Sequence, residues 1–313
     1  MDDLHLTAPL ASFHGERPEA PEWFSRALRR EPARRLIDVA GAKIETLVWE
    51  PAGPATKPAL LLLHGNGAHA DWWSFLAPFF AGERRVVAFS WSGMGGSDWR
   101  PSYARAVFER EAVEIAEATS LYENGPPVLI GHSFGGRVAL SLVGAHGEQF
   151  RAAVIVDPPV FAPDRVKLPG PWDRESRPHR PYPTFAEAMA RFRFMPAQSC
   201  ANLFIADYIA RGSLRAAPDG EGWAWRFDPF MWRNMAPEDA LAIVRAVKRP
   251  VALIRGGVSK LMRAEDAAFM MSLLPPGSPY FEIPEADHHV MVDQPLAFVA
   301  GVEGLLAGWP PAN

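Results

Sequence analysis

The chain has 313 residues, of which 48% are hydrophobic and 22% charged, a composition typical of a globular protein with a sizeable core. Its formal net charge is -4 at pH 7 and it contains no long run of Lys or Arg, which argues against nucleic acid or an anionic membrane as the main partner. A single cysteine, Cys200, excludes an internal disulfide and a metal site built from cysteines.

The N-terminal residues, MDDLHLTAPLASFHGERPEAPEW, carry early acids and no continuous apolar run, so they do not resemble a secretory signal. No stretch of the sequence is long and apolar enough to span a bilayer, and we expect no stable membrane insertion. These features predict a cytoplasmic protein. Residues 1–32 are expected to form an N-terminal extension in which PEWFSRALRR is a surface helix.

Strand and helix patterns alternate along most of the chain. Two β-rich segments, ARRLIDVAG and KIETLVWE, flank Ala40-Gly41-Ala42 and predict a hairpin. Further strands are predicted in PALLLLHGNG, RRVVAFSW, PPVLIGH, RAAVIVDPP, PVALIRGG and SPYFEIPEADHH. Helices are predicted from Asp71, over 103–119, beyond Gly135 and from about Pro295. The alternation predicts a mostly parallel sheet with right-handed crossovers.

One segment, 158–234, interrupts this rhythm. It contains two helix-like stretches, FAEAMARF and CANLFIADYIARG, and ends in GWAWRFDPFMW. Its density of Phe, Trp and Ile argues against a disordered linker. We therefore predict a mainly helical cap (lid) domain at 158–234, inserted into a core domain formed by 33–157 and 235–313.

A candidate nucleophile lies in GHSFG. The apolar run Val128-Leu129-Ile130 leads directly into Gly131-His132-Ser133-Phe134-Gly135, and a helical pattern follows. So short a turn from strand to helix forces Ser133 into a strained conformation and holds its hydroxyl at the carboxyl edge of the sheet. A serine hydroxyl is a poor nucleophile unaided, so a base and an oxyanion site must come from elsewhere in the chain.

The order of the hairpin, LLLHGNG, GMGGSD, GHSFGG, VIVDPP, the cap and ADHHVMVDQP resembles the α/β-hydrolase superfamily, from about residue 33 to the C-terminus. Within it the chain resembles the capped esterases and lipase-like members. The resemblance implies an α/β fold with a mostly parallel eight-stranded sheet, flanking helices and a cap after the sixth strand. It implies no metal and no organic cofactor.

By this resemblance the base lies just after the last strand, where His288 stands, with His289 as its rival. The family usually has glycine where Asp287 stands here. The oxyanion hole would use the backbone amides of Asn66 and Phe134. Two other histidines, His64 in the HG turn and His132 beside the nucleophile, are expected to orient loops.

The histidine also needs a carboxylate that orients it, the third member of a Ser-His-acid triad. At the position of this acid the chain departs from the family pattern. The usual position is three residues after Gly256, where Ser259 stands, followed by Lys260. Some relatives place the acid one strand earlier, which gives Asp157 in VIVDPP. Glu265 and Asp266 remain alternatives, although acids at that point favour the start of a helix.

These residues predict a serine hydrolase that cleaves a carboxylic ester or related acyl bond of a small molecule. Ser133 argues against haloalkane dehalogenases and epoxide hydrolases, which carry aspartate there. A carbon–carbon bond hydrolase, a lactonase, a cofactor-free perhydrolase and a non-catalytic ligand-binding protein remain alternatives. Trp223 and Trp225 are candidate substrate contacts in a cap rich in aromatic residues. Such residues favour an apolar or aromatic substrate, but they could equally serve to pack the cap onto the sheet. These cap aromatics are Trp172, Trp223, Trp225, Phe227, Phe230 and Trp232.

Overall fold

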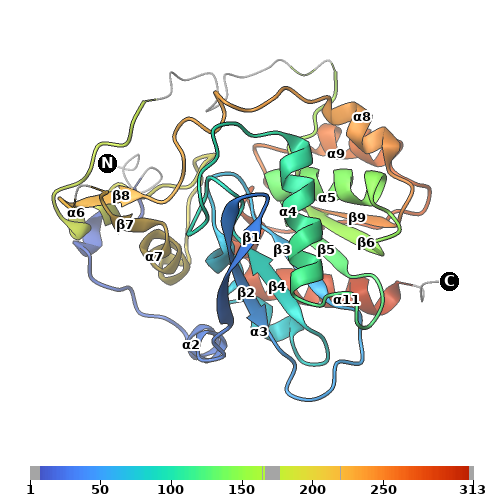
Figure 1. Ribbon diagram of the computed structural model, residues 1–313, viewed down its shortest axis with the longest axis horizontal. Coiled ribbons are helices and arrows are strands. Elements are labelled where there is room, and N and C mark those ends of the chain that lie inside the picture. Colours follow the sequence, from blue (N-terminus) through green and yellow to red (C-terminus); the bar gives the residue numbers. More distant parts are fainter. Residues whose placement is uncertain (1–7, 164, 166–176, 219, 310–313) are drawn as a thin grey trace.

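The computed structural model describes residues 8–163, 165, 177–218 and 220–309, so Trp172 lies outside the described residues. Its main feature is an eight-stranded sheet with the strand order β1-β2-β4-β3-β5-β6-β9-β10 (Figure 1). The strands are β1 Ala33–Val39, β2 Ala42–Trp49, β3 Leu60–Leu63, β4 Val86–Phe89, β5 Val128–His132, β6 Ala152–Val156, β9 Val251–Gly256 and β10 Tyr280–Ile283.

The sheet confirms the predicted fold class. β1 and β2 form the expected antiparallel hairpin, β2 is antiparallel to β4, and the remaining neighbours are parallel. In the register of β5 with β6, His132 pairs with Val156. The residues that follow these two, Ser133 and Asp157, therefore lie side by side at the carboxyl edge of the sheet.

The central strands are continuously apolar because both faces of the sheet are buried. Leu60 and Leu62 belong to one hydrophobic cluster, whereas Leu61 and Leu63 belong to another, as the twofold period of a strand requires. Side chains of α4, α5, α8 and α9 complete the second cluster, and those of α3, α7 and α11 join the first. The helices are α2 Glu22–Leu28, α3 Ala77–Phe80, α4 Arg105–Ala118, α5 Phe134–Ala145, α6 Phe185–Met189, α7 Leu203–Gly212, α8 Ala240–Ala246, α9 Ala264–Leu273, α10 Val290–Asp293 and α11 Pro295–Gly308.

The helix expected from Asp71 is broken into two pieces. A 3-10 helix, η2, covers Ala70–Trp73, and α3 begins only at Ala77. Pro78 accounts for the break, because proline has no N–H to donate and fits only the first turn of a helix.

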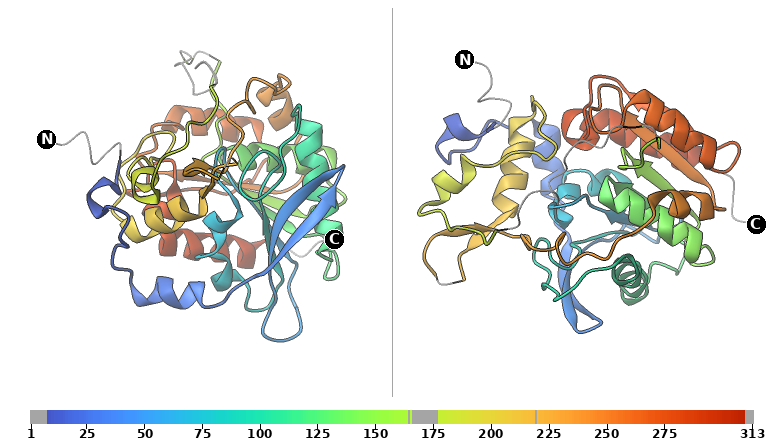
Figure 2. Two further views of the ribbon diagram at one scale, coloured as in Figure 1. Left: turned by 60° about the vertical axis from the view of Figure 1, so that its left-hand side comes forward. Right: turned by 90° about the horizontal axis from the view of Figure 1, so that it is seen from above.

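The cap segment, as we call residues 158–234, contains α6 and α7 where helices were predicted. It also contains an antiparallel hairpin that the sequence did not predict, formed by β7 Leu214–Ala216 and β8 Trp223–Trp225. The part of the N-terminal segment that the structure describes lies beside these cap elements (Figure 2). There the Arg211 guanidinium donates to the Gly15 carbonyl at 2.6 Å.

α2 carries one buried face, as an amphipathic surface helix does. Phe24 on that face contacts Phe204 and Tyr208 of α7 and Phe75 of the core, with ring centres 5.0 to 5.9 Å apart. The helix thus packs against both the cap segment and the core.

Among the residues described, no helix combines the length and the apolar character needed to cross a membrane. The same residues contain no group of three or more His, Cys, Asp or Glu placed to hold a metal ion.

Candidate active site

Ser133 occupies a sharp turn between β5 and α5. Its φ of 53° and ψ of -117° place it in a conformation that side chains rarely adopt. The flanking glycines allow the turn to close. A Cβ on Gly131 would lie 2.4 Å from the Gly135 carbonyl oxygen, and a Cβ on Gly135 would lie 2.4 Å from the Leu63 carbonyl oxygen. Larger residues at either position would push strand and helix apart.

The structure brings Ser133, His288 and Asp157 into one hydrogen-bonded chain. The Ser133 hydroxyl lies 3.0 Å from Nε2 of His288, and Nδ1 of His288 lies 2.7 Å from Oδ2 of Asp157. All three residues are buried, and Ser133 is only 8% exposed. A buried carboxylate bonded to Nδ1 fixes the histidine tautomer in which Nε2 can accept the serine proton.

The Asp157 carboxylate accepts two hydrogen bonds besides the one from His288. Its Oδ2 also accepts the Ser259 hydroxyl at 2.7 Å, and its Oδ1 accepts the Gly256 amide at 3.1 Å. Ser259, which stands where the family usually has its acid, here donates a hydrogen bond to Asp157 at the end of the neighbouring strand β6. The sequence had identified Ser259 only as a missing carboxylate.

Neither alternative acid is bonded to His288. Glu265 is exposed at the start of α9. Asp266 is buried and pairs with Arg165 at 2.8 Å and Arg263 at 3.1 Å. The predicted helix start at these two acids is confirmed, and Asp266 serves to anchor the turn before α9.

His289, the rival base, is bonded away from Ser133. Its backbone amide and its Nδ1 both meet Oε1 of Gln198, at 2.9 and 2.6 Å. Gln198 lies in the cap segment, and nothing in the sequence pattern marked it as part of the site. Asp287 accepts the backbone amides of His288 and Lys260, at 2.8 and 2.9 Å, which stabilises the turn where the family usually has glycine.

The other two histidines near the nucleophile are held in structural bonds. Nε2 of His64 accepts the Trp91 amide at 3.0 Å, and burial lowers the pKa of His64 to about 3. Nε2 of His132 bonds the His288 carbonyl oxygen at 3.0 Å, and burial lowers the pKa of His132 well below its usual value. Both rings are therefore neutral at pH 7.

The two predicted oxyanion donors belong to the two segments that meet at Ser133, the start of α5 and the loop after β3. Phe134 opens α5, so its amide belongs to the first turn, where helix amides have no acceptor within the helix. Asn66 follows Gly65, and a Cβ on Gly65 would lie 3.2 Å from Cβ of Ser133. Glycine thus lets the loop that carries Asn66 pass close to Ser133.

Trp223 and Trp225 pack inside the cap segment. The ring centre of Trp223 lies 4.8 Å from that of Phe185, and Trp225 lies 6.1 Å from Tyr182. Trp232, at the end of the segment, instead contacts Phe134 beside the nucleophile, with ring centres 5.8 Å apart.

A second group of aromatic residues packs on His289, the neighbour of His288. Trp72 and the cap residue Phe194 both contact the His289 ring, with centres 5.4 and 5.0 Å apart. The sequence analysis did not single out either residue, because their proximity to the site arises only from the fold.

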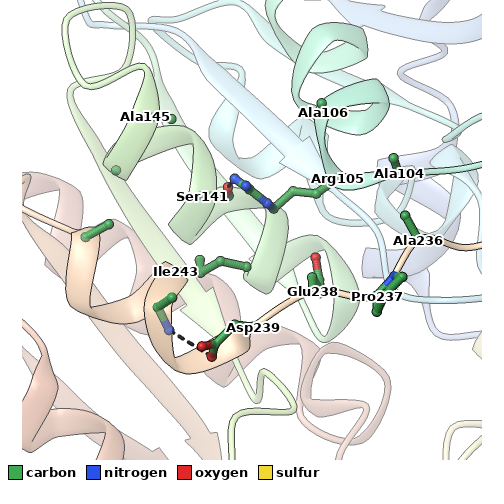
Figure 3. Close-up of a pocket in the computed structure, with 13 residues that line it drawn as sticks. Ala104, Arg105, Ala106, Ser141, Ala145, Ala236, Pro237, Glu238, Asp239 and Ile243 are labelled. Carbon is green, nitrogen blue, oxygen red and sulfur yellow. Dashed lines mark hydrogen bonds between the residues drawn. The ribbon is translucent and has the colours of Figure 1, made fainter.

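A surface cavity of about 510 Å³ lies between α4, α5 and α8 (Figure 3). Arg105, Ser141, Glu238, Asp239 and Ile243 are among its lining residues. Ser133, Asp157 and His288 do not border it. The Asp239 carboxylate caps α8 by accepting the Leu241 and Ala242 amides. This cavity is therefore separate from the candidate active site.

Several curated relatives are esterases or lipases by name. The chain is 34% identical to a lipase of Mycobacterium tuberculosis over 112 residues, which span 36% of this chain and only 40% of the lipase. It is 25% identical to an esterase of the same organism over 292 residues, which span 88% of this chain and 90% of the esterase.

Among solved structures, E-2-(acetamidomethylene)succinate hydrolase superposes with a TM-score of 0.71 at 20% identity, covering 88% of this chain and all of that one. At this identity the likeness establishes the fold. The model of the alpha/beta hydrolase family matches residues 60–302, a range that contains Ser133, Asp157 and His288. The chain belongs to the alpha/beta hydrolase family.

Proposed function

We propose that the protein is a serine hydrolase that cleaves a carboxylic ester or related acyl bond of a small molecule. The observation that carries this proposal is the hydrogen-bonded chain from Ser133 through His288 to Asp157. The named esterase and lipase relatives support the same class of reaction.

In the proposed mechanism His288 takes the Ser133 proton at Nε2 while Oγ attacks the substrate carbonyl carbon. Asp157 accepts the Nδ1 proton in a hydrogen bond and stabilises the imidazolium that forms. The amides of Asn66 and Phe134 bind the oxyanion. His288 then protonates the leaving alcohol, and the acyl group stays on Ser133 until water, activated by the same histidine, releases the acid.

Turnover of p-nitrophenyl esters and labelling by a fluorophosphonate probe test the proposal together. A serine hydrolase is expected to hydrolyse the esters and to carry the label on Ser133. A protein that does neither, although folded, would be a ligand-binding member of the family, and the proposed function would be wrong.

The substrate class is proposed from aromatic residues near the triad. Trp232 packs on Phe134, the residue after Ser133. Trp72 and Phe194 pack on His289, the residue after His288. Aromatic walls favour an apolar or ring-containing substrate.

This arrangement predicts different roles for the cap tryptophans. Trp232→Ala is expected to change the ratio of kcat/KM between bulky and short acyl esters by about tenfold, because it removes a ring that packs on Phe134, the residue next to Ser133. Trp223→Ala is the matched control: it removes an equal side chain that packs on Phe185. The measurement is kcat/KM over a series of p-nitrophenyl esters. If Trp223→Ala shifts selectivity and Trp232→Ala does not, the substrate contacts lie at the hairpin, as first expected from the sequence.

Ser259→Ala is expected to reduce kcat by about tenfold, since a hydrogen bond to a charged group is worth about 1.5–3 kcal/mol. The variant removes one of the donors that hold Asp157. Ser259→Thr keeps the hydroxyl and serves as the control. Steady-state kinetics decide the matter: a kcat equal to that of the wild type in the alanine variant would show that Ser259 does not position Asp157.

A further inference from the structure

Gln198 links the cap segment to the turn that carries the catalytic base. It lies between α6 and α7 and is only 2% exposed. Its Oε1 meets the backbone amide and Nδ1 of His289, and its Nε2 lies 3.0 and 2.9 Å from the two carboxylate oxygens of Asp293. Both partners follow His288 within five residues.

The chemistry of an amide fixes which atoms carry protons in this cluster. The amide oxygen accepts only, so Nδ1 of His289 carries a proton and donates it. The amide nitrogen donates only, so the Asp293 carboxylate accepts from it. Asp293 also accepts the Asp287 amide at 2.8 Å. Asp293 thus joins the two ends of the turn that holds His288. Gln198 holds Asp293 and His289 within that turn.

The cluster keeps a second imidazole neutral next to the base. The ring centres of His288 and His289 are 4.8 Å apart, and His132 lies 5.5 Å from His289. The pKa of His289 lies well below its usual value. Burial is the largest cause, and the neighbouring His288 and His132 act in the same direction. An uncharged amide as its partner leaves that pKa low, whereas a carboxylate in its place would draw a proton onto the ring.

Other charged and titratable groups surround the cluster. Burial raises the pKa of Asp293 to about 6, although the hydrogen bonds from the Asp287 amide and from Gln198 oppose this rise; the negative charge of Asp287 adds to it. The Lys260 ammonium lies 3.4 Å from Asp287. The Cys200 thiol, whose pKa burial and Asp293 raise to about 12, stays protonated.

We propose that Gln198 is a positioning residue for the reaction. It fixes the position of the turn that carries His288, and it keeps the His289 ring uncharged beside the base. This inference rests on the proposed function, because it concerns the same histidine. The cap segment would thereby contribute directly to the alignment of the base.

The experiment compares three variants of the full chain. Gln198→Leu removes both bonding functions at similar size. Gln198→Glu keeps the acceptor but places a second carboxyl group against Asp293. Asn202→Ala is the control, because Asn202 also lies in the cap segment and bonds this turn, at the Val292 and Asp293 carbonyl oxygens, without touching His289. The readouts are kcat and KM for a p-nitrophenyl ester from pH 5.5 to 9, with thermal unfolding of each variant.

Gln198→Leu is expected to lower kcat by about tenfold or more with little change in KM, because a misaligned base slows the chemical step. Gln198→Glu is expected to approach wild-type kcat at the acid end of the range. There the introduced carboxyl group shares a proton with Asp293 and bonds as the amide does. At higher pH it ionises, charges His289, and the ratio of variant to wild-type kcat falls. Asn202→Ala is expected to keep the wild-type pH profile.

The inference would be overturned if the glutamate variant kept a pH-independent ratio to wild type and the leucine variant, when folded, kept wild-type kcat. Should the leucine variant fail to fold, the pH profile of the glutamate variant decides alone. Fluorophosphonate labelling of Ser133 separates this inference from the proposed function. A labelled, active wild type with indifferent Gln198 variants rejects only the role of Gln198, whereas an unlabelled, inactive wild type rejects both.

Discussion

Ser133→Ala is expected to abolish ester hydrolysis while the fold stays intact. The hydroxyl makes its bond to His288 at 3.0 Å, and no larger group is lost with it. In serine hydrolases, loss of the nucleophile lowers kcat by about a million-fold, and the residual rate comes from the oxyanion hole and binding alone. Steady-state turnover of a p-nitrophenyl ester, with thermal unfolding to verify the fold, measures the effect.

Ser141→Ala provides a matched control for this variant. Ser141 is also buried on α5, but its hydroxyl bonds Glu109 and Arg105 on α4, away from the triad. It is expected to lose some stability and to keep its activity. A Ser133→Ala variant that kept more than about a tenth of wild-type turnover would remove Ser133 from the mechanism.

The parts of the structure that follow from local sequence were predictable. Leu60–Leu63 is apolar at every position, and this marks a strand buried on both faces. The Gly-x-Ser-x-Gly turn was predictable for a similar reason, because close packing of β5, α5 and the β3 loop admits no side chain at Gly131 or Gly135. Both patterns can be recognised in residues within a few positions of each other, although the contact of Gly135 with Leu63 of β3 is visible only in the fold.

The hairpin β7–β8 was not predictable from its own residues. Its strands are three residues long, and its stability comes partly from Tyr182, whose backbone pairs with Trp223, and from Phe185, whose ring packs on Trp223. These partners lie about forty residues away, beyond the reach of a local pattern. Gln198 was not predictable for the same reason. A single glutamine forms no periodic pattern, and its bonds to the turn after His288 are seen only in the folded chain.

The triad acid was predictable only in part. The missing carboxylate at Ser259 pointed to Asp157, yet sequence alone left Glu265 and Asp266 open. The strand register separates them, since β6 ends next to the turn after β5, whereas α9 carries its acids toward Arg165 and solvent. A position on the sheet edge is a property of the topology rather than of the motif.

Asp157→Asn is therefore expected to lower kcat by about ten-thousand-fold while keeping the size and shape of the side chain. An amide at this position can turn its NH2 group toward His288, and it then stabilises the tautomer whose proton is on Nε2. That tautomer cannot accept the Ser133 proton. The amide also carries no charge to stabilise the imidazolium in the transition state. The measurement is kcat for a p-nitrophenyl ester, with fluorophosphonate labelling as a second readout of serine reactivity.

Asp266→Asn and Glu265→Gln are the controls, because they change the two acids that the sequence left open. Asp266→Asn weakens the pairs with Arg165 and Arg263 and is expected to cost about 1–3 kcal/mol of stability with little loss of kcat. Glu265→Gln, at an exposed position, is expected to change neither by much. The opposite ranking, with Asp157→Asn nearly as active as wild type and either control inactive although folded, would transfer the role of the acid from β6 to the start of α9. A triad in that arrangement would require the His288 turn to move during catalysis, because in the structure Nδ1 of His288 is already bonded to Asp157 at 2.7 Å.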